Sequence, residues 1–265
     1  MYLELIQRLD NKSNHERRDI IIEQLDSWNV NFSQHKYSSG TNLVVDLGDT
    51  TKKLGISSHF DRVPNSPGAN DNGSAIGVCF DLIKKFRNAD NKDLGLRVFF
   101  FDEEEVGLKG STAYVKQHGV ADMTGLINLE LVGLGDRLAI WPINDNANGK
   151  ILETLEMVSK RLQIETKRFD QIVTNTADHV PFQKAGLEAF TITYISERDI
   201  ETAYHYSKAL EFDVDMDTLR EILSTAPIFE HYHRPTDTYD RLNEESMAMT
   251  SVVAWNTALA MQNQR

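Results

Sequence analysis

The sequence has little cysteine, no long apolar run and a deficit of positive charge. The one cysteine, Cys79, cannot form an intramolecular disulfide, nor a metal or iron–sulfur site built from several cysteines. No apolar stretch approaches the roughly 18 residues that indicate a transmembrane helix. With 28 Lys and Arg against 40 Asp and Glu, the formal net charge is −12. That acidity argues against partners such as nucleic acid and anionic membranes.

The remaining composition fits a soluble globular protein, because 40% of the residues are hydrophobic and 26% are charged. The first residues, Met1–Glu4, contain neither a basic stretch nor an apolar core, so we expect no signal peptide and a cytoplasmic location. A length of 265 residues allows one or two domains of about 150 residues each. Because no repeat or linker interrupts the chain, we predict one domain over residues 1–265. The sequence gives no indication of the oligomeric state.

Segments with strand and helix character alternate along the chain. The nearly continuous apolar run Leu96–Phe101 is typical of a strand buried on both faces of a parallel sheet, and Ser13 with Glu16 forms a capping-box pattern that starts a helix. Alternation of this kind predicts an α/β fold: a single domain with a central, mostly parallel or mixed sheet flanked by helices. The further predicted strands are Asn42–Asp46, Lys53–Ser58, Gly125–Leu131, Arg137–Trp141 and Ala189–Tyr194; the further helices are Ala75–Phe86, Asn148–Leu162, Val180–Ala185 and Glu244–Met261.

Five clusters rich in His, Asp and Glu lie where α/β proteins collect ligands. Four are placed just after predicted strands, and the fifth lies in a turn before the last helix. Because ligands bind beyond the carboxyl ends of the strands in open α/β sheets, we expect these side chains to converge. Several strands that end in carboxylate or imidazole groups indicate a metal site. The clusters are Ser58–Asp61, the predicted loop segment Gly68–Gly73, Asp102–Gly107, Asn128–Glu130 and His233–Thr238.

Each cluster also has an ordinary structural explanation when it is taken alone. His59 beside Asp61 could be a hydrogen-bonded histidine next to a surface acid, and Asn70–Gly73 is a common turn and helix-start sequence. The acidic run Asp102–Glu105 could be a solvated loop. Four acids directly after the buried Val98–Phe101, however, repel one another unless a cation is present. Taken together, the five clusters favour a metal centre.

These pieces resemble the co-catalytic di-zinc aminopeptidase family, which is related to glutamate carboxypeptidase and, with one zinc, to glutaminyl cyclase. They follow one another in the family's order over Ser58–Thr238, most of the chain. The most specific piece is Glu104–Ser111, which reads Glu-Glu-x-Gly-Leu-x-Gly-Ser. The resemblance implies a single metallopeptidase domain that removes N-terminal residues from peptides. A peptide or aminoacyl compound would then be the substrate.

The resemblance also implies the metal ligands. Asp71 would bridge two divalent ions. His59 and Glu130 would complete the ligands of one ion, and Glu105 and His233 those of the other. Oxygen and imidazole ligands without thiolate suit Zn²⁺, with Mn²⁺ or Co²⁺ as substitutes. One departure concerns Glu130, because the family often has Asp at that position.

The implied catalytic residues are Glu104 and Asp61. Glu104, next to a ligand but not itself coordinating, would be the general base for a hydroxide that bridges the two metals, and Asp61 would orient the imidazole of His59. The peptide bond between Asp71 and Asn72 would be cis, as it often is in the family.

Some assignments stay open at this stage. His231 competes with His233 as a ligand, because both would lie on one face if that segment were extended. Asp178 and His179 either face the substrate or support the site, the alternative for Asp178 being a helix N-cap. The insertion Ser196–Phe229 could form a lid or pocket wall, with candidate wall residues that could equally be ordinary packing: Tyr204, His205, Tyr206 and Phe212.

The function has alternatives within and outside the enzymes. A glutaminyl cyclase would use the same ligand order with one zinc and transfer the acyl group to the substrate's own amine. A carboxypeptidase is also compatible, because the metal centre does not decide which peptide end is recognised. A non-catalytic peptide-binding domain is less favoured, since every expected ligand position holds a competent residue.

Overall fold

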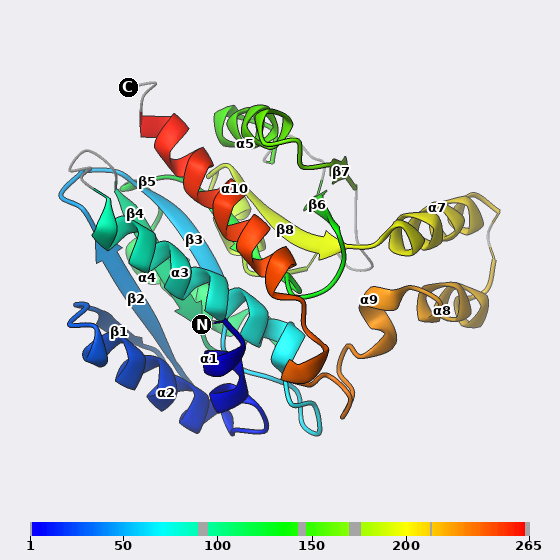
Figure 1. Cartoon of the computed structure of the whole chain (residues 1–265), viewed down its shortest axis with the longest axis horizontal. Coiled ribbons are helices and arrows are strands. Elements are labelled where there is room, and N and C mark those ends of the chain that lie inside the picture. The colour runs from blue at the N-terminus through cyan, green and yellow to red at the C-terminus, as the bar shows by residue number, and fades with distance from the viewer. Residues whose placement is uncertain (1, 90–94, 143–146, 170–175, 213, 263–265) are drawn as a thin grey trace.

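The computed structural model describes residues 2–89, 95–142, 147–169, 176–212 and 214–262. Within them, eight strands form one mixed sheet in the order β1-β2-β4-β3-β5-β8-β6-β7, flanked by helices (Figure 1). The predicted class, a single α/β domain with a mixed sheet, is confirmed. The strands are β1 (Ser33–Lys36), β2 (Thr41–Leu47), β3 (Lys53–His59), β4 (Leu96–Phe101), β5 (Met123–Leu129), β6 (Arg137–Trp141), β7 (Thr166–Arg168) and β8 (Ala189–Ile195).

The centre of the sheet is parallel, antiparallel pairs lie on both sides of it, and the edge pair β6–β7 is again parallel. β3 pairs in parallel with both β4 and β5, and β5 pairs in parallel with β8. The pairs β1–β2, β2–β4 and β6–β8 are antiparallel. The carboxyl ends of β3, β4 and β5 therefore meet at one edge. The prediction of a strand over Gly125–Leu131 was shifted, since β5 ends at Leu129 and Leu131 has a positive φ of 54°.

The hydrophobic core lies on both faces of β4, as its apolar sequence predicts. Val98 and Phe100 belong to the larger core cluster, on the face that α3 (Ser74–Asn88) and α10 (Glu244–Gln262) cover side by side (Figure 1). Phe99 and Phe101 pack in a second cluster with side chains of α4 (Lys109–His118) and α6 (His179–Lys184).

The N-terminal helices are α1 (Tyr2–Leu9) and α2 (Asn14–Ser27), and α5 (Lys150–Arg161) packs against α10. The capping box at the start of α2 is confirmed, because the Ser13 hydroxyl accepts from the backbone N–H of Glu16 and the Glu16 carboxylate accepts from that of Ser13. None of the helices in the described part of the chain has the length and apolar character needed to cross a membrane.

Two segments differ from a simple α/β alternation. After β8, the insertion forms three helices that extend to one side of the sheet, α7 (Glu197–Glu211), α8 (Met216–Ser224) and α9 (Pro227–Glu230) (Figure 1). Within the predicted loop before α3, Ala69–Gly73 forms a helical turn, η1, with non-helical dihedral angles at Asp71 and Asn72. The peptide bond between these two residues is cis, as expected. A short 3₁₀ turn, η2 (Tyr239–Arg241), precedes α10.

Candidate metal centre

The predicted ligands come together at the edge where the parallel strands end. His59 is the last residue of β3, Glu105 follows β4, and Glu130 directly follows β5. Asp71 reaches the same place from η1, and His233 from the turn between α9 and η2. The ends of three strands, the turn η1 and one distant turn are therefore needed to assemble these five side chains.

The five side chains form two triads that share Asp71. In the first, His59 Nε2 lies 3.2 Å from Asp71 Oδ1 and 3.0 Å from Glu130 Oε1. In the second, His233 Nε2 lies 3.1 Å from Asp71 Oδ2 and 3.0 Å from Glu105 Oε2. The donor atoms of each triad lie within 4.8 Å of one another. The two oxygens of Asp71 thus face two different imidazoles.

This donor set fits two divalent cations. Each triad offers one imidazole nitrogen and two carboxylate groups, which is ligand chemistry that Zn²⁺ accepts. Among the described residues, Glu105 Oε1 is buried without a hydrogen-bond partner, so the site leaves an oxygen that a cation would satisfy. Three carboxylates face two imidazoles in a space that excludes most water. The ligand roles themselves stay predictions.

Burial and crowding shift the pKa values of these groups. Burial and the charge of Asp71 raise the pKa of Glu105 to about 7, and burial raises that of Glu130. Burial would also raise the pKa of Asp71, but hydrogen bonds from His233 and His59 outweigh it and hold that pKa below its usual range. Burial would lower the pKa of His233, yet the Asp71 and Glu105 carboxylates raise it to about 10. Without metal, the imidazoles therefore act as counter-ions of the carboxylates.

Asp61 contacts both His59 and the turn that carries Glu104 and Glu105, so it does more than orient the imidazole of His59. Its Oδ1 lies 3.3 Å from His59 Nδ1, and its backbone oxygen lies 3.1 Å from the same nitrogen, which leaves Nε2 directed at the carboxylates. The two carboxylate oxygens also accept hydrogen bonds, each of 3.0 Å, from the backbone N–H groups of Glu104 and Glu105. One buried carboxylate therefore positions an imidazole and the turn after β4.

Glu104 is placed beside the triads but belongs to neither. It lines a hollow together with Glu130, and its backbone is held by Asp61. Burial raises its pKa well above that of an ordinary glutamate. This is the environment expected of a proton acceptor and donor, and the role of general base stays a prediction.

Sequence reasoning missed two residues that hold the Asp71 turn. Asp237 accepts hydrogen bonds from the backbone N–H groups of Asn70 (2.8 Å, at Oδ1) and Asp71 (3.1 Å, at Oδ2). The signal for Asp237 was its spacing of four residues from His233. Arg17, fully buried on α2, donates to the carbonyl oxygen of Gly68 and has no signal in the sequence beyond its place in a helix.

The competition between His231 and His233 is decided by a turn. His233 has a φ of 58°, so the segment is not extended and the condition for a shared face with His231 is not met. His231 Nδ1 lies 2.9 Å from the hydroxyl of Thr236 and takes part in neither triad. The ring of Tyr232 stacks on that of His233 at 3.7 Å between centroids, which restricts the imidazole.

Asp178 and His179 are both buried near this edge. Asp178 makes no side-chain cap on α6, which removes the N-cap explanation, and burial raises its pKa to about 7. His179 Nδ1 lies 2.7 Å from the hydroxyl of Thr191, and burial lowers the pKa of this histidine to about 3. Its ring meets Trp141 edge-on at 5.4 Å, and Nε2 has no hydrogen-bond partner in the described part of the chain.

A hollow of about 300 Å³ opens beside the carboxylates, and its walls are mainly apolar and aromatic. The predicted wall residues Tyr204 and His205 are not among its lining residues. Both are exposed on α7, Tyr204 with 61% of its surface accessible, so that prediction is wrong and the end of α8 and α9 supply the wall instead. The lining consists of Glu104, Glu130, Leu131, Trp141, Thr176, Thr193, Leu223, Ser224, Phe229, Tyr232 and Arg234.

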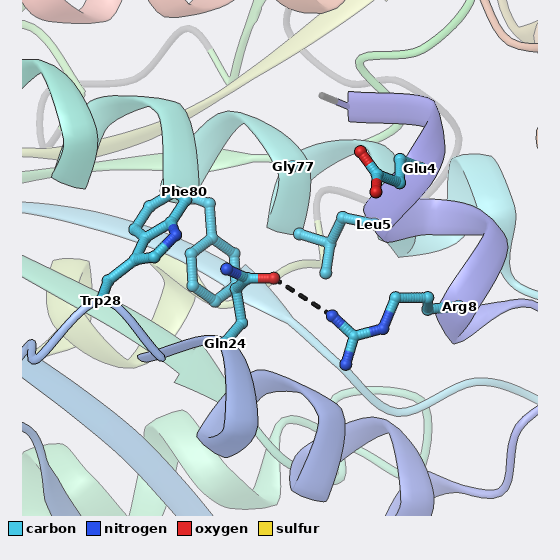
Figure 2. A pocket seen from close by; sticks show the side chains of 7 residues that line it. All are labelled: Glu4, Leu5, Arg8, Gln24, Trp28, Gly77 and Phe80. Carbon is cyan, nitrogen blue, oxygen red and sulfur yellow. Dashed lines mark hydrogen bonds between the residues drawn. The ribbon is translucent and has the colours of Figure 1, made fainter. Parts of the chain in front are cut away.

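A second hollow of similar size, about 260 Å³, lies between α1, α2 and α3 (Figure 2). Two of its polar side chains are paired with each other, because Arg8 donates to Gln24 at 3.1 Å, and Arg8 also donates to Glu23 at 3.0 Å. Trp28 packs edge-on against Phe80 at 5.5 Å. None of its lining residues belongs to the metal triads, so this hollow carries no chemistry comparable to the first.

Comparison with known proteins places this geometry in a family. The model of Peptidase family M28 matches residues 42–258, well over half of the chain. The chain is 26% identical over 185 residues to aminopeptidase YwaD of Bacillus subtilis, a match that covers 66% of the chain and 40% of that protein. It is 27% identical over 205 residues to the vacuolar membrane protease of Candida glabrata, covering 72% of the chain and 21% of that protein. The chain thus spans less than half the length of these relatives.

Two solved structures share the fold. A zinc aminopeptidase from Bacillus subtilis superimposes with a TM-score of 0.64 at 22% identity, over 83% of this chain and 49% of that one. The glutaminyl cyclase of Porphyromonas gingivalis superimposes with a TM-score of 0.71 at 16% identity, over 98% and 94%. At these identities the likeness shows the fold.

Proposed function

Because the chain belongs to peptidase family M28, we propose that it is a zinc-dependent aminopeptidase that hydrolyses the N-terminal residue from peptides. One observation carries the proposal: two triads share Asp71, and Glu104 lies next to them outside both. The zinc aminopeptidase of Bacillus subtilis with the same fold supports the choice of metal. Mn²⁺ and Co²⁺ are substitutes with compatible ligand chemistry.

The residues of the two triads would bind metal, and Glu104, outside both triads, would transfer the proton. His59, Asp71 and Glu130 would hold one divalent ion, and Asp71, Glu105 and His233 the other. When bound, two such ions supply Lewis acidity and bring the pKa of water from about 15.7 toward 7. Asp61 keeps the turn after β4 in register with His59.

Glu104 moves the proton. Its carboxylate accepts a proton from the water that attacks the scissile carbonyl, and the resulting carboxylic acid then protonates the leaving amine. Burial suits both steps, because it raises the pKa of Glu104 toward the range in which a carboxyl group can accept and donate near neutral pH. The hollow beside Glu104 and Glu130 would receive the N-terminal residue, and its acidic end favours a free ammonium group.

The proposed substrate is a peptide or aminoacyl compound. We propose neither nucleic acid nor a membrane as a partner of this chain. A cytoplasmic location stays a prediction, and one matched relative is named a vacuolar membrane protease.

Glutaminyl cyclase activity is the second candidate, favoured by the superposition that covers 94% of the Porphyromonas gingivalis enzyme. The two candidates differ in metal count and in product. A cyclase would hold one zinc and release ammonia from an N-terminal glutamine, whereas an aminopeptidase with both triads filled would hold two ions and release a free amino acid.

The test combines elemental analysis with a panel of aminoacyl anilides and their N-acetylated counterparts. We expect two ions per chain and hydrolysis that requires the free amine. Cleavage of the acetylated compounds alone would contradict an aminopeptidase and favour a specificity for N-blocked substrates. Ammonia release from a glutaminyl peptide with one ion per chain would establish the cyclase. Stoichiometric metal without any turnover would indicate a peptide-binding domain.

A further inference from the structure

Arg234 lies at the hollow beside the metal triads, immediately after the predicted ligand His233. Its backbone N–H donates to the carbonyl oxygen of His231 at 3.0 Å, and Pro235 follows it, so the main chain is fixed in the same turn that presents His233. The side chain lines the hollow together with Glu104 and Glu130.

The guanidinium of Arg234 makes no hydrogen bond or ion pair with the residues that the structure describes. Other arginines in the chain are engaged: Arg8 with Gln24 and Glu23, and Arg97 with Asp46 and Asp122. In a protein with a net charge of −12, a cation at the mouth of an acidic site that pairs with none of the described acids is available to a ligand.

The hollow is lined by charges of both signs. Glu104 and Glu130 contribute negative charge, and Arg234 is the one cationic side chain among its described lining residues, although it forms no ion pair with either glutamate. The apolar side chains Leu131, Trp141, Leu223 and Phe229 line the same hollow. Its volume of about 300 Å³ is at the lower end of the range for small-molecule sites, about 300–1,000 Å³.

We propose that Arg234 binds the C-terminal carboxylate of a short peptide, so that the enzyme acts preferentially on dipeptides. This inference rests on the proposed aminopeptidase function. A dipeptide carries an ammonium at one end and a carboxylate at the other, with a single peptide bond between them. That distribution complements a hollow that is lined both by carboxylates and by a guanidinium that none of the described acids neutralises, and a guanidinium can bind a carboxylate through two parallel hydrogen bonds.

An acidic side chain on the N-terminal residue would present the same carboxylate chemistry. The composition of the lining argues against it, because an acidic side chain against Leu131, Trp141 and Phe229 would lose hydration that these apolar groups do not replace. The structure therefore favours an apolar N-terminal side chain against these groups and the free C-terminal carboxylate on Arg234. The substrates below separate the two sources of the carboxylate.

The test compares four compounds on the metal-loaded protein: leucyl-glycine, leucyl-glycinamide, leucine p-nitroanilide and aspartic acid p-nitroanilide. We expect kcat/KM for leucyl-glycine to exceed that for its amide by about 10- to 100-fold, the range typical of a hydrogen bond to a charged group. Arg234→Gln should remove this preference, so that kcat/KM for leucyl-glycine falls by more than that for the amide or the leucine anilide and becomes equal to that for the amide. The matched control Arg220→Gln, which removes a surface cation of α8 paired with Asp217, should retain the preference.

Four results would overturn the inference. The first three are equal rates for leucyl-glycine and its amide in the unaltered protein, a preference that survives Arg234→Gln, and a uniform loss on all four compounds. A selective loss on the aspartic acid anilide would overturn it too, in favour of an acidic side chain on Arg234. Thermal unfolding of both variants verifies that they are folded.

A binding measurement separates this inference from the proposed function. A reduced-amide analogue of leucyl-glycine, which cannot be hydrolysed, and its C-terminal amide are titrated calorimetrically into the unaltered protein and Arg234→Gln. Tighter binding of the free acid that depends on Arg234 supports the inference even if no peptide is hydrolysed, in which case the hydrolase proposal alone fails. Equal binding of acid and amide, with hydrolysis of leucine anilide intact, would refute the inference alone.

Discussion

The two ends of strand β4 differ in how their charged side chains are neutralised. At the amino end, Arg97 donates to Asp46 at 2.7 Å, to Asp122 at 2.8 Å and to the hydroxyl of Tyr114 at 3.2 Å. At the carboxyl end, the turn that follows the strand contributes Glu104 and Glu105 to a cluster rich in carboxylates. The first end carries its own counter-ion, whereas the second has more carboxylates than cationic groups.

This difference has a consequence for the pKa values. Hydrogen bonds and charge from Arg97 outweigh burial and hold the pKa of Asp46 below its usual range. At the other end, burial raises the pKa of both Glu104 and Glu105. A carboxylate whose pKa rises on folding opposes folding at neutral pH unless an external cation compensates for it. A charge cluster that the protein does not neutralise itself therefore points to a ligand.

The largest expected effect at the carboxyl end is on catalysis. Glu104→Gln should lower kcat by about 10²- to 10⁴-fold, the usual share of general acid–base catalysis, while the metal content stays unchanged. The matched control is Glu103→Gln, the preceding acid, which pairs with Lys109 at 3.5 Å and belongs to neither triad. Steady-state kinetics on an aminoacyl anilide, with elemental analysis of each variant, provide the measurement. Full activity of Glu104→Gln would remove Glu104 from the mechanism.

A smaller effect, on the stability of the whole protein, is expected at Arg17. This buried cation donates hydrogen bonds to the backbone just before Asp71, a residue of the cluster at the carboxyl end. Arg17→Met leaves the carbonyl oxygen of Pro67 without its donor and leaves that of Gly68 with only the backbone N–H of Gly73, so the free energy of unfolding should fall by about 1–3 kcal/mol. Arg18→Met, on the neighbouring partly exposed position, should change it by less than about 0.5 kcal/mol.

Chemical denaturation of the metal-loaded protein measures both variants. Equal stability of Arg17→Met and Arg18→Met would show that the buried guanidinium does not support the turn before Asp71.

The pH dependence of metal binding should reveal the protonated imidazoles. In the metal-free protein, carboxylates raise the pKa of His233 to about 10 and that of His59 well above its usual value. Both are therefore protonated at neutral pH, and a metal must displace those protons. The apparent affinity should rise with pH by about tenfold per unit for each proton released, between pH 6 and 8. Competition with a chelator measures it, and an affinity that is flat over this range would contradict protonated ligands.

Much of the sheet and the identity of the site could be predicted from the sequence for physical reasons. The run Leu96–Phe101 is apolar at every position but one, because both faces of β4 are buried, and the acids follow it directly. Convergence of His59 and Glu130 with these acids then follows from the parallel pairing of neighbouring strands. The edge strands β1 and β7 were not predicted, since they are short, polar and largely exposed.

The supports and the pocket could not be predicted, because they depend on tertiary contacts. Asp237 and Arg17 act on the Asp71 turn across long separations in sequence, through backbone groups that carry no residue-specific signal. Tyr204 suggested a pocket wall by composition, but the orientation of α7 exposes it. Trp141 and Phe229 line the hollow, although in sequence each looks like an ordinary core residue.

The central claim is that the carboxyl end of β4 requires external cations and the amino end does not. Elemental analysis of the purified chain after dialysis tests it most directly, comparing the unaltered protein with Asp71→Ala and Asp46→Ala. The account predicts two divalent ions per chain in the unaltered protein and in Asp46→Ala, and fewer in Asp71→Ala. Stoichiometric metal in Asp71→Ala, or its absence from the unaltered protein after incubation with Zn²⁺, would contradict the account.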